Sequence, residues 1–179
     1  MTNARAAKIK LVLFDVDGVL TDGKIVLHAD GTESKVFDIK DGTAIVWAQR
    51  LGLQVGFLSA RTSAATAQRA AQLGITLVHQ GVPSKLETYD QIADSLLLED
   101  EQIAYMGDDI LDLPVLSRVG LAAAPADAAA DVRQRVHWLS AAKGGAGAAR
   151  DLIELILRAQ DKWESIVATY MAAVQDQQA

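Results

Sequence analysis

Two aspartates, Asp15 and Asp17, end an apolar run near the start of the chain. The run Leu11–Phe14 is short and uninterrupted, which is typical of a strand buried on both faces of a parallel sheet. Ligands of open α/β sheets bind beyond the carboxyl ends of the strands. Either both acids line a crevice there, or the turn only caps the strand with polar residues.

Three later apolar runs, 54–58, 75–79 and 102–106, are followed closely by polar groups that could take part in chemistry. These groups are Ser59, Lys85, Asp108, Asp109 and Asp112. Parallel strands place their carboxyl ends at one edge of a sheet, so we expect these side chains to converge with the first two aspartates.

Several carboxylates at one point cannot all stay ionised without a cation. An all-oxygen ligand set favours Mg²⁺ over zinc. A lysine and a serine hydroxyl beside such a cation are typical of a phosphate site. In that setting Asp15 could act as a covalent nucleophile on phosphorus, and Asp17 could protonate the leaving oxygen and later accept a proton from water.

The elements that must position these residues follow from the hydrophobic pattern. Asp30-Gly31 joins two β-prone runs and predicts a hairpin over about 24–39. Helical spacing predicts helices over 43–51, 63–73, 85–97 and 110–119, and weaker strands are expected at 120–123 and 136–139. Strands that alternate with helices indicate an α/β fold, a Rossmann-like parallel sheet flanked by helices, and we expect residues 1–179 to form a single domain.

The end of the chain has a different pattern. The glycine-rich stretch 143–147 predicts a flexible segment, and an apolar stripe predicts one long helix over about 148–174. A helix that continues past the last strand needs something to pack on. We expect another subunit, with packing on its own sheet as the alternative.

Composition limits the possible functions. The net charge of -6 argues against a nucleic-acid-binding protein. The chain has no cysteine, which excludes thiolate catalysis and cysteine-ligated metals. No apolar run approaches the ~20 residues of a membrane span, so no membrane partner and a cytoplasmic location are expected. The stretch 145–149 fits a dinucleotide fingerprint, but no βαβ unit follows it, which disfavours a nicotinamide-binding protein.

The order and spacing of these motifs resemble the haloacid dehalogenase superfamily of phosphatases. DVDG, Ser59, Lys85 and GDDILD correspond to its four motifs. The resemblance implies a capless fold with a hairpin in place of a cap domain. It also implies that Asp15 is the nucleophile, that Asp17 is the acid/base, and that Mg²⁺ is held by Asp15, the carbonyl of Asp17 and Asp108. Ser59 and Lys85 would hold the phosphoryl group, with Asp109 or Asp112 in support.

Within this superfamily, FDVDGVLTDG, LSAR, MGDDILDLPVL and KGGAGAARDLIELIL resemble the 3-deoxy-D-manno-octulosonate 8-phosphate phosphatase family. That resemblance implies hydrolysis of a sugar acid phosphate in lipopolysaccharide precursor synthesis, by a homotetramer whose neighbouring subunits close the site. The substrate has a carboxylate besides its phosphate, so Arg61, Lys40 and Lys143 are candidate anion contacts. Ala60, beside Arg61, stands where the family often has glycine.

Two alternatives remain open. The anion contacts do not fix the length of the sugar, so a phosphatase for a nine-carbon sugar acid 9-phosphate is one. The other is a non-catalytic relative that serves as a binding or scaffold protein.

Overall fold

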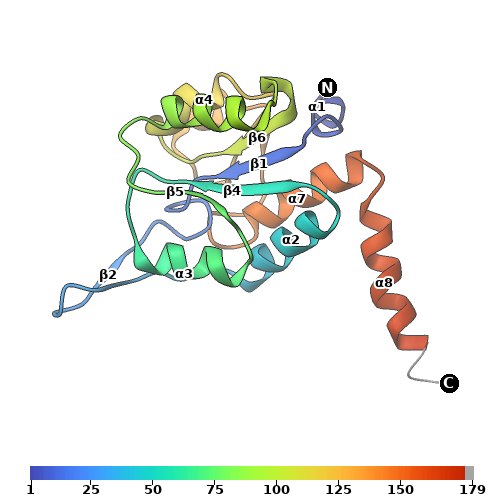
Figure 1. Cartoon of the computed structure of the whole chain (residues 1–179), viewed down its shortest axis with the longest axis horizontal. Coiled ribbons are helices and arrows are strands. Elements are labelled where there is room, and N and C mark those ends of the chain that lie inside the picture. The colour runs from blue at the N-terminus through green and yellow to red at the C-terminus, as the bar shows by residue number, and fades with distance from the viewer. Residues whose placement is uncertain (176–179) are drawn as a thin grey trace.

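The computed structural model describes residues 1–175, and its core is a six-stranded parallel sheet (Figure 1). The strand order is β5-β4-β1-β6-β7-β8. The strands are β1 (Leu11–Phe14), β4 (Gln54–Leu58), β5 (Leu77–His79), β6 (Ile103–Met106), β7 (Leu121–Ala124) and β8 (Trp138–Leu139). The predicted fold class is confirmed.

Strand β1 lies inside the sheet and is fully buried. Val12 and Phe14 face one hydrophobic cluster, whereas Leu11 and Leu13 face the other. Alternate residues of a strand point to opposite faces of the sheet. A strand covered on both faces therefore needs the unbroken apolar run that opens this sequence.

Helices cover both faces of the sheet (Figure 1). One face carries α1 (Thr2–Ala6), α2 (Ile39–Arg50), α3 (Ala64–Gln72) and α7 (Ala148–Ala159). The other carries α4 (Lys85–Leu96), α5 (Leu113–Leu116) and α6 (Ala130–Arg133). The short 3-10 turns η1 (Asp100–Gln102) and η2 (Ile110–Asp112) complete the connections. The helix expected over 110–119 is thus split into η2 and α5.

The chain reverses its direction across the sheet beside β1. It runs outward from β1 to β4 and β5, then returns to form β6 on the opposite side of β1. Such a reversal opens a crevice beyond the carboxyl ends of the two strands. The loops that carry Asp15 and Asp108 therefore meet.

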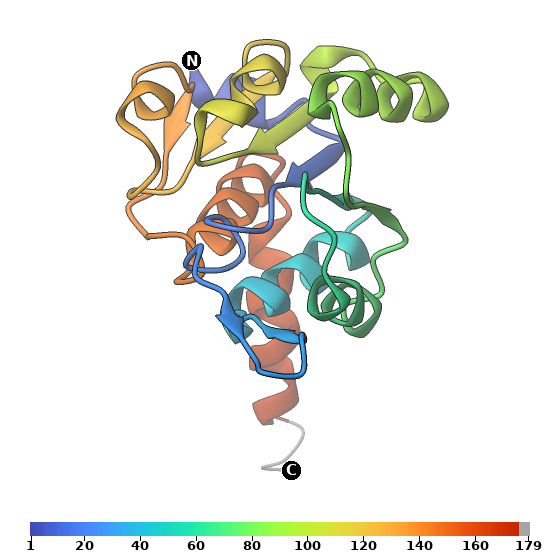
Figure 2. The ribbon, with the colours of Figure 1, turned by 90° about the vertical axis from the view of Figure 1, so that its left-hand side faces the viewer.

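A two-stranded hairpin follows β1 and takes the place of a cap domain. Its strands are β2 (Val26–Leu27) and β3 (Glu33–Ser34), so it is shorter than the predicted 24–39. It projects from the body of the protein on the side opposite α8, the last helix (Figure 1), and Figure 2 shows it below the sheet.

Helix α2 begins earlier than predicted because of its N-cap. The carboxylate of Asp38 accepts hydrogen bonds from the backbone N–H groups of Lys40 and Asp41. A carboxylate at this position satisfies N–H groups that have no partner within the helix. Lys40 therefore lies in the first turn of a helix.

The prediction of one helix over 148–174 is wrong, since two helices, α7 and α8 (Trp163–Gln175), occupy this region. The break lies at Asp161, whose φ of 57° is left-handed. It redirects the chain so that Trp163 packs edge-on against Trp47, with ring centroids 5.8 Å apart. The break thus lets Trp163 bury its ring against its own chain.

The glycine-rich stretch 143–147 is packed, so the expectation of a flexible segment is wrong. The N–H of Gly145 donates to the carbonyl of Val19, and that of Gly144 donates to Asp127. A Cβ on Gly144 would lie 1.8 Å from the carbonyl oxygen of Gly18. Glycine lets this loop support the turn that follows Asp17.

Among residues 1–175, no helix has both the length and the apolar character needed to cross a membrane.

Candidate active site

A cavity of about 210 Å³ lies at the carboxyl edge of the sheet. Ten residues line it: Asp15, Asp17, Ser59, Ala60, Arg61, Lys85, Asp108, Asp109, Leu111 and Asp112. Nine of these ten were selected from the sequence, the exception being Leu111. The structure therefore brings together residues that lie almost 100 positions apart.

Two larger hollows, of about 420 and 780 Å³, lie elsewhere. The first is lined in part by Gln54 at the start of β4. The second is lined in part by Lys10 and Gln102, which precede β1 and β6. They therefore open at the amino edge of the sheet, away from the converging carboxylates. We place the candidate site in the smaller cavity because the reactive side chains are there.

Lys85 is the central cation of the cavity. It is the first residue of α4, its side chain is 7% exposed, and its Nζ lies 2.9 Å from Asp15 Oδ1. The same Nζ contacts Asp112 Oδ1 and lies 3.2 Å from the hydroxyl of Tyr105. Although burial opposes the charge, Asp15 and Asp112 raise the pKa of Lys85 overall, so it stays protonated.

Asp112 is held by four donors, which argues against its acting as a metal ligand. Its Oδ1 accepts from Lys85 and from the hydroxyl of Tyr105. Its Oδ2 accepts from the N–H groups of Asp108 and Asp109, at 3.0 and 3.1 Å. Asp112 therefore positions Lys85 and the Asp108 loop.

Asp109 lines the cavity and also supports its backbone, since its Oδ1 accepts from the N–H of Ile110 at 2.7 Å and so caps η2.

Asp108 and Asp15 form the part of the cavity best suited to a cation. One carboxylate oxygen from each, together with one from Asp112, lie within 4.8 Å of one another. Asp108 Oδ1 is buried without a hydrogen-bond partner. A buried unpartnered carboxylate oxygen is costly unless a cation neutralises it.

The carboxylates raise one another's pKa values. Burial, and then the charges of Asp15 and Asp112, raise the pKa of Asp108 from 3.8 to about 8. Burial raises the pKa of Asp15 to about 6, with Lys85 opposing the shift. A divalent ion would reverse both shifts because it favours the charged forms. The all-oxygen donor set fits Mg²⁺.

Gly18 lets the loop of Asp108 approach the turn after β1. Its φ is 97°, and a Cβ there would lie 2.1 Å from Asp108 Oδ2. Only glycine accepts both the left-handed backbone and the close approach. The glycine of the DVDG motif therefore sets the distance between the two acidic loops.

Ser59 and Arg61 enter the cavity from the loop after β4. Ser59 is 3% exposed, and its Oγ accepts from the N–H of Arg61 at 3.3 Å. Because Ser59 Oγ acts as an acceptor in this contact, its hydroxyl proton remains available for a hydrogen bond to a ligand. Ala60 and Arg61 are exposed at the mouth of the cavity.

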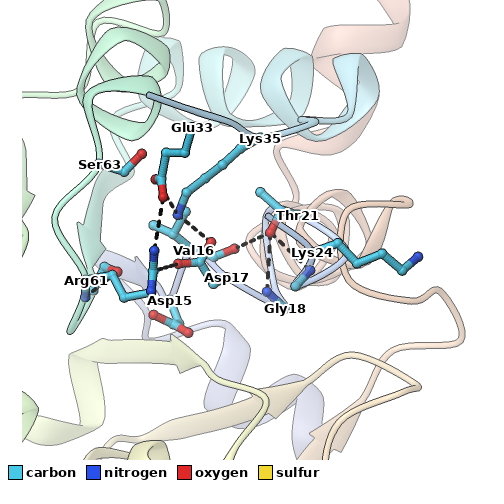
Figure 3. A network of polar contacts seen from close by, with 12 residues as sticks. Asp15, Val16, Asp17, Gly18, Thr21, Lys24, Glu33, Lys35, Arg61 and Ser63 are labelled. Carbon is cyan, nitrogen blue, oxygen red and sulfur yellow. Dashed lines mark hydrogen bonds and ion pairs between the residues drawn. The ribbon is translucent and has the colours of Figure 1, made fainter. Parts of the chain in front are cut away.

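Asp17 faces a second group of charges, most of which the hairpin supplies (Figure 3). Its Oδ1 is paired with Lys35, and its Oδ2 lies 3.5 Å from Arg61 Nε. Glu33 completes the group, with Oε2 3.0 Å from Arg61 and Oε1 3.8 Å from Lys35. Two cations therefore alternate with two carboxylates.

Lys40 and Lys143 do not line the cavity. Lys40 is exposed in the first turn of α2, and Lys143 is exposed in the loop before α7. Neither is placed in direct contact with the other site residues.

Lys35, Glu33 and Tyr105 were not identified as site residues from the sequence. Lys35 and Tyr105 lie within runs interpreted only as strands. No motif or spacing in the sequence marks Lys35, because the 1% exposure of its side chain depends on how the hairpin folds back over Asp17.

Relatives of known name match most of the length of this chain. A 3-deoxy-D-manno-octulosonate 8-phosphate phosphatase of Yersinia pestis is 41% identical over 160 residues, covering 89% of this chain and 86% of the relative. The chain belongs to the 3-deoxy-D-manno-octulosonate 8-phosphate phosphatase family. Its predicted membership of the haloacid dehalogenase superfamily is confirmed by the same relatives.

Solved structures of this family agree with the fold. A 3-deoxy-D-manno-octulosonate 8-phosphate phosphatase of Moraxella catarrhalis, in complex with a magnesium ion, a phosphate ion and a KDO molecule, has a TM-score of 0.92 and 33% identity, covering 94% of this chain and 97% of that one. A probable phosphatase of Pseudomonas syringae has a TM-score of 0.93 and 44% identity, covering 94% and 96%. No family model matches the chain.

We expect Mg²⁺ to raise the Tm, and to raise it more at pH 8 than at pH 6. Protons compete with the cation below the pKa values of about 8 for Asp108 and about 6 for Asp15. Since both values exceed the 3.8 of an unfolded chain, the two acids favour the metal-free fold at low pH and lose that contribution as pH rises. Mg²⁺ offsets the loss.

Scanning calorimetry with and without Mg²⁺ at the two pH values measures this difference. Asp108→Asn should remove most of the difference between the Mg²⁺ effects at the two pH values. Asp22→Asn, a change at an exposed ion pair, should leave that difference unchanged. An equal Mg²⁺ effect at both pH values in the unmodified protein would contradict the assignment.

Proposed function

We propose that this protein hydrolyses 3-deoxy-D-manno-octulosonate 8-phosphate to the free sugar acid and phosphate. The observation that carries the proposal is the cavity in which Asp15, Lys85 and Asp108 meet at the edge of a family fold. The names of the relatives supply the substrate. The reaction belongs to the synthesis of lipopolysaccharide precursors, as the resemblance implies.

Asp15 acts as the nucleophile. An oxygen of its carboxylate forms a bond to phosphorus while the bond from phosphorus to the sugar oxygen breaks, which yields an aspartyl-phosphate and the sugar alcohol. Lys85, 2.9 Å from Asp15, holds the carboxylate and meets the phosphoryl charge. Ser59 donates its hydroxyl proton to a phosphoryl oxygen.

Asp17 transfers the protons. In the first step it donates a proton to the sugar oxygen, and in the second it removes one from the water that attacks the aspartyl-phosphate. Its carboxylate lines the same cavity as Asp15 but is held by different partners. The two acids can therefore perform separate tasks.

Asp15, Asp108 and the backbone carbonyl of Asp17 would hold Mg²⁺. When bound, the ion neutralises charge on the carboxylates and on the transferred phosphoryl group.

Arg61 is the best-placed contact for the carboxylate of the substrate. It lies at the mouth of the cavity, and a guanidinium matches a carboxylate with two parallel donors. Lys40 and Lys143 remain more distant candidates, which would act through long-range attraction or after movement of the segments that carry them.

The protein is also proposed to work as a homotetramer in which neighbouring subunits close the cavity. The hairpin supports this, because Leu27 and Val36 are 77% and 76% exposed. Exposed aliphatic side chains on a projecting hairpin are typical of an interface.

We expect Asp15→Asn to lower kcat by more than about 10³-fold while Tm changes little, because the amide is a poor nucleophile of the same shape. Phosphate release and thermal unfolding measure the two effects, with Asp22→Asn as the control. Excess EDTA should also stop the unmodified enzyme. Substantial residual turnover in Asp15→Asn would exclude Asp15 as the nucleophile.

A panel of sugar phosphates tests the substrate. We expect kcat/KM for octulosonate 8-phosphate to exceed that for neuraminate-type 9-phosphates and hexose phosphates by at least about 10-fold. A preference for a 9-phosphate would support the nine-carbon alternative. Absence of phosphate release from every compound would support the scaffold alternative.

Light scattering tests the assembly. The unmodified protein should have four times the mass of one chain, and Leu27→Asp with Val36→Asp should shift it to smaller species, because charges on the hairpin disfavour an apolar interface. A monomeric unmodified protein at micromolar concentration would refute the tetramer.

A further inference from the structure

The hairpin carries a buried lysine whose partners all belong to the acid/base region of the site. The side chain of Lys35 is 1% exposed, although lysine is almost never fully buried without a partner. Its Nζ pairs with Asp17 Oδ1 and lies 3.8 Å from Glu33 Oε1 (Figure 3). The ammonium group of Lys35 is therefore buried against the carboxylate of Asp17.

The two oxygens of Asp17 differ in their surroundings. Oδ1 accepts the hydrogen bond of Lys35. Oδ2 is buried without a hydrogen-bond partner, and its nearest cation is Arg61, whose Nε lies 3.5 Å away. One oxygen is thus fixed and the other is left free to exchange a proton.

We propose that Lys35 is a positioning residue that fixes Asp17 so that Oδ2 transfers the proton to and from the reacting oxygens. The proposal rests on the function assigned above. In the first step the proton on Oδ2 passes to the sugar oxygen, the bond from that oxygen to phosphorus breaks, and Asp15 forms its bond to phosphorus. Oδ1 accepts from Lys35 before and after this transfer.

Glu33 fixes the positions of the Lys35 and Arg61 side chains relative to each other. Its two oxygens face these two cations, at 3.8 Å and 3.0 Å, so the four side chains balance in charge. Removal of one member of a largely buried group leaves its partner uncompensated. The hairpin therefore does more than shield the cavity, since it fixes the orientation of the acid.

The dependence on leaving group tests the proposal. A sugar alkoxide needs a proton in the transition state, whereas 4-nitrophenolate leaves readily without one. The ratio kcat/KM covers only the steps up to departure of the leaving group, so the hydrolysis of the aspartyl-phosphate, which both substrates share, does not enter it. We expect Lys35→Met to lower kcat/KM for octulosonate 8-phosphate by about 10²-fold. It should lower kcat/KM for 4-nitrophenyl phosphate by less than about 3-fold. Lys35→Arg, which keeps the charge, should retain much of the activity on octulosonate 8-phosphate that Lys35→Met loses.

Three controls make the outcome decisive. Lys24→Met removes an exposed lysine before β2 and should leave both substrates unaffected. Asp17→Asn should show the same selective loss as Lys35→Met. Thermal unfolding verifies that each variant is folded, and Glu33→Gln provides a milder test if Lys35→Met does not fold.

Failure of the inference differs from failure of the proposed function. If Asp17→Asn is selective but folded Lys35→Met loses both substrates equally, or neither, then Lys35 does not position the acid. If Lys35→Met does not fold, and Glu33→Gln used instead shows no selective loss for the sugar phosphate, the proposal is also overturned. If Asp17→Asn itself is not selective, the role of Asp17 in the proposed function is wrong.

Discussion

Like-charge repulsion at the carboxyl edge of the sheet is the constraint on which the rest of the site depends. Asp15, Asp108 and Asp112 place carboxylate oxygens within 4.8 Å of one another. Lys85 offsets part of this repulsion, as do the hydroxyl of Tyr105 and two backbone N–H groups. These partners satisfy Asp112 and leave Asp108 Oδ1 unpartnered, so the uncompensated charge is concentrated where a cation would bind.

The sheet topology makes this concentration possible. Because β6 pairs with β1 on the side opposite β4, the Asp108 loop lies next to the Asp15 loop. Gly18 allows the two loops to approach each other. Gly144 and Gly145 pack against the turn that follows Asp17 and support it. Backbone geometry therefore fixes the distance between the acids.

Most of the site was predictable because its residues follow directly after strands. A strand is recognised from a local apolar run, and parallel pairing then brings Asp15, Ser59 and Asp108 to one edge. Lys35 and the break at Asp161 were not predictable, since both depend on contacts between distant segments. Lys35 is buried only because the hairpin folds back over Asp17, and α8 turns because Trp163 packs on Trp47.

The hairpin resolves a problem that a small fold without a cap domain faces. Phosphoryl transfer requires an acid that is oriented and partly shielded from water, yet the open edge of a sheet offers few side chains above it. Glu33 in β3 and Lys35 directly after β3 reach the site and engage Asp17 and Arg61 together. The same segment exposes Leu27 and Val36 on the outside. An interface at the hairpin would hold its strands in place, so subunit contacts and the orientation of Asp17 would be linked through a few residues of backbone.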